Sequence, residues 1–165
     1  MGQDVLKISE FIQTQHIYLN VELSDKNAVL KFIAETAEEK GLIESGDHLF
    51  DGLKQREESM STGVGDGLAF PHTTTEREQA AVMILKLIRP VPFDAIDDRD
   101  VDVIFAILIP ESNQTQHLQI LARVARLCRK PEFLSTVRRE NDPDALKRAI
   151  MNLEEEITDI FYRTE

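Results

Sequence analysis

The sequence predicts a single α/β domain built on a central mixed, largely parallel β-sheet with helices on both faces. Helical and strand patterns alternate along the 165 residues with short connections, which favours layered α/β packing over a helical bundle or a β-sandwich. Two apolar runs, 80–88 and 101–109, are rich in β-branched and large aliphatic residues, as strands covered on both faces are. Because no repeat or linker divides the chain, we expect one core.

The first part of the chain predicts a strand followed by two helices. Apolar and polar side chains alternate over 16–23, which indicates the strand. Ser24 or Asp25 is placed to cap the next helix, and Gly41 is placed to end it. A second helix is expected over 46–57.

The C-terminal part predicts three helices after the two apolar strands. The first is expected to begin near Thr115 and to end before Pro131, a short helical piece follows, and Asp142 with Pro143 opens the last helix. The expected buried stripe of the first of these helices is Leu118, Leu121, Ala122, Ala125 and Cys128.

The last helix has the apolar spacing of a two-helix contact. This spacing covers only about two heptads, so packing onto its own domain and self-association as a dimer both stay open. We therefore divide the chain into a domain over 1–150 and a C-terminal helical extension over 151–165. The apolar seam is Leu146, Ile150, Leu153, Ile157 and Ile160.

The composition excludes several classes of protein. A formal charge of −11 argues against nucleic acid and anionic membrane surfaces as partners, because those are bound by basic patches. The single Cys128 forms no internal disulfide, and no apolar run approaches the roughly 20 residues of a membrane span. With no cleavable signal at the N-terminus, we expect a cytoplasmic protein.

The most informative stretch of the chain is residues 61–72, STGVGDGLAFPH. Its alternate glycines permit tight turns and close backbone approach, and Pro71 fixes its own φ while it restricts Phe70 to extended geometry. We therefore expect this segment to hold His72 rigidly.

Three side chains far apart in the sequence form the predicted active site: His72, His117 and Arg56. Phosphoryl transfer between proteins needs an unprotonated imidazole nitrogen as nucleophile and donors that stabilise the transferred charge. His72 is the candidate nucleophile, His117 near a helix N-terminus is a candidate donor, and the Arg56 guanidinium suits phosphate oxygens. Without the surrounding motif, each of them would be interpreted as an ordinary structural or solvated residue.

The spacing of these residues resembles a known family. Arg56 and Glu57, followed by residues 61–72, fit the pattern Arg-Glu-x-x-x-Ser-Thr-Gly-x-Gly-x-Gly-x-Ala-x-Pro-His at every fixed position. This is the pattern of the enzyme IIA domains of the bacterial phosphoenolpyruvate-dependent phosphotransferase system, fructose/mannitol class, and most of all their nitrogen-regulatory branch. Residues 92–97 and the His117-Leu118 pair are also similar, and the resemblance extends over about 5–150.

The resemblance implies a phosphohistidine at His72, with the phosphoryl group accepted from a histidine phosphocarrier protein, and no cofactor. His117 corresponds to the second active-site histidine. Thr62 and the amides of Gly63 and Gly65 are expected to support phosphoryl binding, and so is Thr73, although many relatives have glycine directly after the phosphorylated histidine.

Three functions stay open from the sequence. The first is a nitrogen-regulatory phosphocarrier that signals to target proteins by its phosphorylation state, and the second is a sugar-specific IIA component that passes phosphate to a IIB partner for fructose- or mannitol-type transport. The third, much weaker, is a metal-dependent hydrolase with His72 and His117 as ligands. Only Asp66 or Glu57 offers a third ligand, without a ligand-spacing motif, so we expect no metal.

The remaining polar candidates are given structural interpretations. His16 and His48 have no motif around them and are expected to be surface histidines or hydrogen-bonded ones. Cys128 is expected to be a small core residue. The basic residues Arg123, Arg126 and Lys130 are expected to form a solvated helix face.

Overall fold

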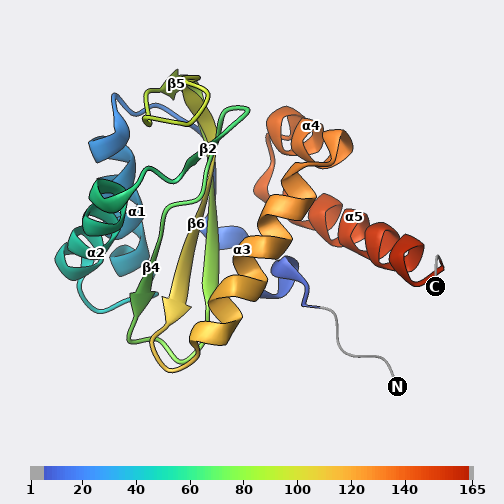
Figure 1. Cartoon of the computed structure of the whole chain (residues 1–165), viewed down its shortest axis with the longest axis horizontal. Coiled ribbons are helices and arrows are strands. Elements are labelled where there is room, and N and C mark those ends of the chain that lie inside the picture. Colours follow the sequence, from blue (N-terminus) through green and yellow to red (C-terminus); the bar gives the residue numbers. More distant parts are fainter. Residues whose placement is uncertain (1–5, 164–165) are drawn as a thin grey trace.

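The protein forms three layers, with a twisted sheet between two layers of helices (Figure 1). The computed structural model describes residues 6–163, and the side chains of that range except those of Gln114 and residues 157–163. α1 and α2 cover one face of the sheet, and α3, α4 and α5 lie on the other. The predicted α/β class is confirmed.

Residues 6–163 contain five α-helices, six strands and two 3-10 helices. The helices are α1 (Lys26–Glu39), α2 (Gly46–Ser59), α3 (Gln114–Cys128), α4 (Pro131–Arg139) and α5 (Pro143–Arg163). The strands are β1 (Ile17–Val21), β2 (Gly63–Gly65), β3 (Leu68–Ala69), β4 (His72–Thr75), β5 (Ala81–Val91) and β6 (Val101–Pro110), and η1 (Ile8–Phe11) and η2 (Thr14–His16) precede β1.

The sheet is mixed, in the order β1-β5-β6-β3-β2, with β4 also paired to β6. The pairs β1–β5, β3–β6 and β4–β6 are parallel, whereas β5–β6 and β2–β3 are antiparallel. Along β4, His72 lies opposite Ile107 and Thr73 opposite Leu108. The two short strands β3 and β4 therefore share one edge of β6, and the chain between them is short.

The central strand β6 divides the core into two halves. Its side chains alternate between the faces of the sheet, as strand geometry requires. Val103, Phe105 and Ile107 are fully buried beneath α3, α4 and α5, while Ile104 and Ala106 are fully buried beneath α1 and α2. Burial on both faces explains why this strand reads as a continuous apolar run.

Helix ends follow the local sequence. Asp25, not Ser24, caps α1 by accepting a hydrogen bond from the Ala28 amide at 2.8 Å. Gly41 follows the C-terminus with φ of +76°, a conformation that glycine adopts without strain.

The predicted buried stripe of α3 is wrong at two of its five positions, because Leu121 and Ala125 pack against the core and Cys128 is buried. Leu118 is 71% exposed and Ala122 is exposed, whereas Ile120, Val124 and Leu127 are buried. Two faces of α3 are apolar enough to pack against the sheet. The face that packs on the sheet carries the larger side chains, because alanine offers little apolar area to bury. Cys128 is buried as predicted, and burial raises the pKa of its thiol to about 12.

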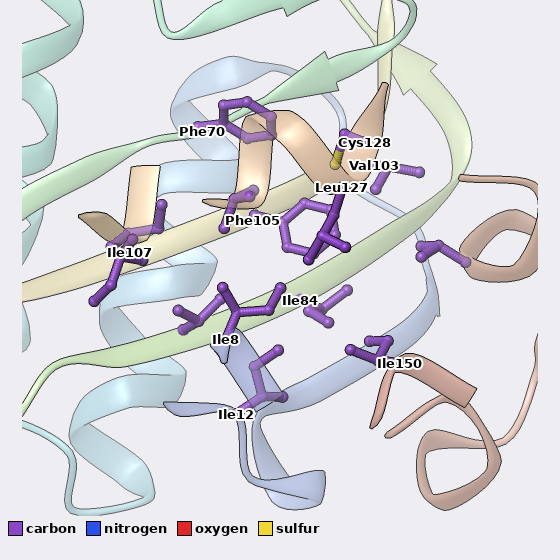
Figure 2. Packing of buried hydrophobic residues seen from close by; sticks show 14 of the residues in the cluster. Ile8, Ile12, Phe70, Ile84, Val103, Phe105, Ile107, Leu127, Cys128 and Ile150 are labelled. Carbon is purple, nitrogen blue, oxygen red and sulfur yellow. The ribbon is translucent and has the colours of Figure 1, made fainter. Parts of the chain in front are cut away.

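α5 packs onto its own domain over its first half. Leu146 and Ile150 are buried in the core, and Leu153 packs against it. Figure 2 shows Ile150 in the same cluster as Ile8 and Ile12 from the N-terminal segment. The helix runs through residue 150 without a break, so the predicted boundary there and the dimer contact stay predictions. The remaining seam positions lie outside the described side chains.

An acidic side chain of α5 and a basic side chain of α3 meet inside the protein. Glu154 is fully buried and accepts hydrogen bonds from the amides of Ile8 and Ser9, each at 2.9 Å. Arg123 lies 3.5 Å from the same carboxylate with its side chain 11% exposed. The expected solvated position of Arg123 is therefore wrong, because the buried carboxylate draws it inward.

His16 is buried, with 1% of its surface exposed, and neither ring nitrogen has a hydrogen-bond partner among the described residues. The expectation of a surface or hydrogen-bonded histidine is wrong here. Burial lowers the pKa of His16, and the nearby charges of Arg77 and Lys40 act in the same direction.

None of the described helices is long and apolar enough to span a bilayer.

Candidate active site

His72 is the first residue of β4, and its backbone neighbour fixes its ring. Nδ1 lies 2.8 Å from the carbonyl oxygen of Phe70. Nε2 lies 3.2 Å from Nε of Arg56, a group that only donates. Nε2 is therefore the acceptor, Nδ1 carries the proton and donates to Phe70, and the in-plane lone pair of the ring is on Nε2.

Arg56 reaches His72 from the last turn of α2. Its Nη1 donates to the carbonyl oxygen of Met60 at 2.6 Å, so the guanidinium is tethered to the C-terminal end of its own helix. The Nε–H of the guanidinium is thereby held against the lone pair of the imidazole.

His117 approaches His72 from the other side, in the first turn of α3. The two ring centroids are 5.0 Å apart and the ring planes are inclined by 55°. Nε2 of His117 is buried and has no hydrogen-bond partner among the described residues. A buried polar atom without a partner beside the nucleophile candidate is suited to an oxygen of an incoming group.

Both histidines are held in the neutral form. Burial lowers the pKa of His72 most, the Phe70 carbonyl opposes this, and the charges of Arg56 and His117 lower it further. Burial also lowers the pKa of His117, with the charge of Arg56 as the second cause. At neutral pH the lone pair of His72 is consequently available for nucleophilic attack.

The glycine-rich segment is not a loop but a tight hairpin of β2 and β3. Asp66 and Gly67 turn the chain with φ of +56° and +78°. A Cβ at Gly63 would lie 2.8 Å from the Cβ of Ala95, and one at Gly65 would lie 3.3 Å from the Asp97 carboxylate. The glycines thus let the hairpin pack against the segment that follows β5.

Thr62 is buried, and its polar groups are bound inside the protein. Its hydroxyl donates to Glu57 at 2.6 Å, and its amide donates to the same carboxylate at 2.9 Å. Its carbonyl oxygen accepts from the Phe70 amide at 3.0 Å. A short chain of hydrogen bonds therefore connects Glu57 through Thr62 to Phe70, whose carbonyl orients the His72 ring.

Glu57 and Lys26 support the segment that leads to His72. The sequence indicated Glu57 only as part of the motif and as a possible third metal ligand, and it did not indicate Lys26. Glu57 is only 8% exposed, and Nζ of Lys26 lies 3.5 Å from its carboxylate. Lys26 comes from α1, far away in sequence, and no local pattern marks it.

Thr73, the remaining predicted support residue, contacts α2. A Cβ at Gly52 would lie 2.7 Å from the Thr73 hydroxyl. The structure thus brings His72, Arg56 and His117 together, whereas Thr62, Gly63, Gly65 and Thr73 contact other parts of the protein. Their phosphoryl-binding roles stay predictions.

The acidic residues considered as third metal ligands are engaged elsewhere. Glu57 binds Thr62 and Lys26, and Asp66 lies 3.6 Å from Arg99. Over the described residues, no group of three or more histidine, cysteine, aspartate or glutamate side chains could hold a metal ion.

A neutral imidazole whose lone pair faces an arginine, with a second histidine beside it, lies at the N-terminal end of β4. The family profile of the phosphoenolpyruvate-dependent sugar phosphotransferase system, EIIA 2, matches residues 10–153, and the chain belongs to this family. The resemblance found in the sequence is confirmed.

Its relatives include both nitrogen-regulatory and sugar-specific proteins. A nitrogen regulatory protein of Bradyrhizobium diazoefficiens is 36% identical over 74% of this chain and 80% of its own. A fructose-specific EIIA component of Haloferax volcanii is 32% identical over the same shares. The crystal structure of nitrogen regulatory protein IIA-Ntr from Neisseria meningitidis superposes with a TM-score of 0.80 at 27% identity, covering 87% of this chain and 98% of that one.

Proposed function

We propose that this protein is a phosphocarrier that accepts a phosphoryl group on Nε2 of His72 from a histidine phosphocarrier protein and signals by its phosphorylation state. The observation that supports this most is the hydrogen bonding of the His72 ring. With Nδ1–H on the Phe70 carbonyl and Nε2 facing Arg56, the ring presents its lone pair at Nε2 without first losing a proton.

In the transfer, the phosphorus–nitrogen bond of the donor breaks as a bond forms between phosphorus and Nε2. His72 contributes its lone pair and keeps the proton on Nδ1, so the ring becomes positively charged. The Phe70 carbonyl stabilises that charge. The electron pair of the broken bond stays on the donor imidazole.

Arg56 and His117 stabilise the charge of the group in transfer. The guanidinium turns from Nε2 to the phosphoryl oxygens as the new bond forms. His117 donates from Nε2 in the tautomer that carries its proton there, which gives this unpaired atom a partner. Donors in place before the reaction lower the barrier because they need no reorganisation.

Phosphorylation would alter how targets bind. A phosphoryl group adds roughly −1.5 to −2 charges to a chain with a formal charge of −11. Partners with a basic surface are then bound more tightly and acidic partners are repelled. We expect nitrogen-regulatory-type signalling on this basis, in line with the names of the relatives.

The second candidate is a sugar-specific IIA component that passes its phosphoryl group to a IIB partner. The fructose-specific relative favours this function. One solved structure of similar fold, at 15% identity, is a complex of enzyme IIA mannitol with phosphorylated enzyme IIB mannitol from Escherichia coli. Transfer from the phosphorylated protein to purified IIB proteins separates the two candidates.

The test is intact-mass spectrometry after incubation with phosphoenolpyruvate, enzyme I and the histidine phosphocarrier. Wild-type protein should gain one acid-labile phosphoryl group. His72→Ala should gain none, and His117→Ala should react about 10- to 1,000-fold more slowly, as expected for loss of one preorganised donor. The exposed His48, replaced in His48→Ala, is the matched control and should behave as wild type. An unmodified wild-type protein would contradict the proposal.

A further inference from the structure

Gly52 lies in the middle of α2, where glycine is the poorest helix former after proline. The helix is otherwise capped and regular, and the glycine conformation there is helical rather than left-handed. The residue therefore serves no backbone turn. A glycine at such a position needs a packing reason.

The reason is the side chain of Thr73. A Cβ at position 52 would lie 2.7 Å from Oγ1 and 3.4 Å from Cγ2 of Thr73. The first distance is shorter than any real Cβ contact, whereas contacts of 3.4–4 Å are ordinary. Any side chain at position 52 must displace either α2 or the threonine, by about 0.7 Å if the contact is to relax from 2.7 to 3.4 Å.

This contact lies directly beside the active site. Thr73 follows His72 on β4, and Gly52 precedes Arg56 by one helical turn on the same face of α2. α2 lies alongside β4 in Figure 1, and the two elements are in contact. The spacing of helix and strand at Gly52 is consequently the spacing at which Arg56 meets His72.

Arg56 has little freedom to compensate for a displaced helix. Its Nη1 is bound to the Met60 carbonyl at the end of the helix, so the guanidinium moves with α2. Its Nε is bound to His72 at 3.2 Å, at the upper end of the normal range for such a bond. An outward shift of α2 would break this hydrogen bond.

We propose that Gly52 and Thr73 are a complementary spacer pair that sets the distance between α2 and β4 and thereby holds Arg56 against His72. Both are positioning residues. The inference rests on the proposed function for its effect on phosphoryl transfer, but its effect on the ring of His72 is independent of that function.

The test is a double-mutant cycle of Gly52→Ala and Thr73→Ala. With alanine at both positions, the two Cβ atoms would lie 3.5 Å apart, an ordinary contact. Gly52→Ala in the wild-type background should slow phosphorylation of His72 roughly 10- to 100-fold, as small displacements of positioned groups do. In the Thr73→Ala background, the same change should alter the rate by no more than about twofold.

The second readout is the pKa of His72, followed by NMR titration of its ring in all four proteins. The charge of Arg56 lowers this pKa, so Gly52→Ala should raise it, and the double variant should match Thr73→Ala. Asp51→Ala, an alanine at the neighbouring exposed position of α2, is the control and should change neither readout.

The outcomes separate the two proposals. If wild type is not phosphorylated but the pKa cycle holds, the phosphocarrier function fails and the spacer pair stands. If wild type is phosphorylated and Gly52→Ala leaves rate and pKa unchanged, the threonine has turned aside and the spacer pair is overturned. Equal defects in Gly52→Ala and the double variant would also overturn it. Should Gly52→Ala alone not fold, a folded double variant with the pKa of Thr73→Ala supports the pair, and an unfolded one contradicts it.

Discussion

At the scale of single residues, His72 is defined by one donor and one acceptor. The Phe70 carbonyl fixes the proton on Nδ1, and Arg56 meets the lone pair on Nε2. The pKa of the ring is lowered by burial first and by Arg56 and His117 as well. Arg56 therefore has two effects: it orients the ring and it helps to keep it unprotonated.

Replacing Arg56 by glutamine should shift the pH dependence of phosphorylation. Loss of the guanidinium charge raises the pKa of His72, so the rate of Arg56→Gln should begin to fall at a higher pH than that of wild type as the solution is acidified. Phosphorylation rates measured between about pH 5 and 8 test this. An acid limb at the same pH in both proteins would mean that Arg56 does not influence the protonation of His72.

The sequence indicated the three central residues of this site but not the ion pair of Glu57 and Lys26. His72, Arg56 and His117 lie in segments that resemble the motifs of a known family. Glu57 and Lys26 depend on a carboxylate being buried between two helices and the glycine hairpin. No local pattern encodes that burial, because the partners come together only when the helices pack.

At the scale of elements, the helices differ in how far local sequence defines them. Asp25 and Gly41 define the ends of α1 as predicted. The buried face of α3 was not predictable, because two apolar faces compete and the sheet selects one. α5 is tied to the N-terminal segment through Glu154, over a sequence separation of 146 residues to Ile8.

Two truncations within α5 should have different effects. Removal of residues 152–165 deletes Glu154, leaving the Ile8 and Ser9 amides without their acceptor and Arg123 without this carboxylate. It should lower the free energy of unfolding by about 3 kcal/mol. Removal of residues 157–165 keeps Glu154 and its hydrogen bonds, so it should lower the free energy of unfolding by less than the longer truncation does. Urea denaturation measures both.

The shorter truncation also gives a clean test of the dimer. Because it leaves Glu154 in place, sedimentation velocity on the chain ending at residue 156 reports on association without loss of the domain fold.

In the urea denaturation experiment, equal stability of the two truncated chains would contradict the structural role of Glu154.

At the scale of the whole molecule, the neutral buried histidines make stability depend on pH. The pKa values of His16, His72 and His117 are all lowered in the folded protein. As the pH falls below the ordinary value of about 6.5, the unfolded chain binds protons that the native protein resists. Stability is therefore lost on acidification, down to the lowered native values.

His16→Leu should reduce this acid sensitivity. The ring of His16 is buried without a hydrogen-bond partner among the described residues, so an apolar side chain of similar size fits its surroundings. The stability of the variant should rise relative to that of wild type as the pH falls from 8 to 5, because the variant lacks the ring that takes up a proton more readily in the unfolded chain. Chemical denaturation at both pH values measures this. A constant difference between the two proteins would show that His16 takes up its proton equally well in the folded state.

The sequence predicted the α/β class, the five helices, the first strand, the two long strands and the family, but not the short strands β2, β3 and β4. It also indicated the three side chains proposed for the centre of the site. The elements follow from apolar periodicity and capping residues, which are local properties of the chain, whereas the family and the site residues follow from the resemblance of its motifs to those of a known family. The tertiary structure decided which face of α3 is buried, that Glu57, His16 and Glu154 are enclosed, and how closely α2 approaches β4. Such features depend on which distant segments meet, because the burial of a polar or charged group is determined by the atoms packed around it.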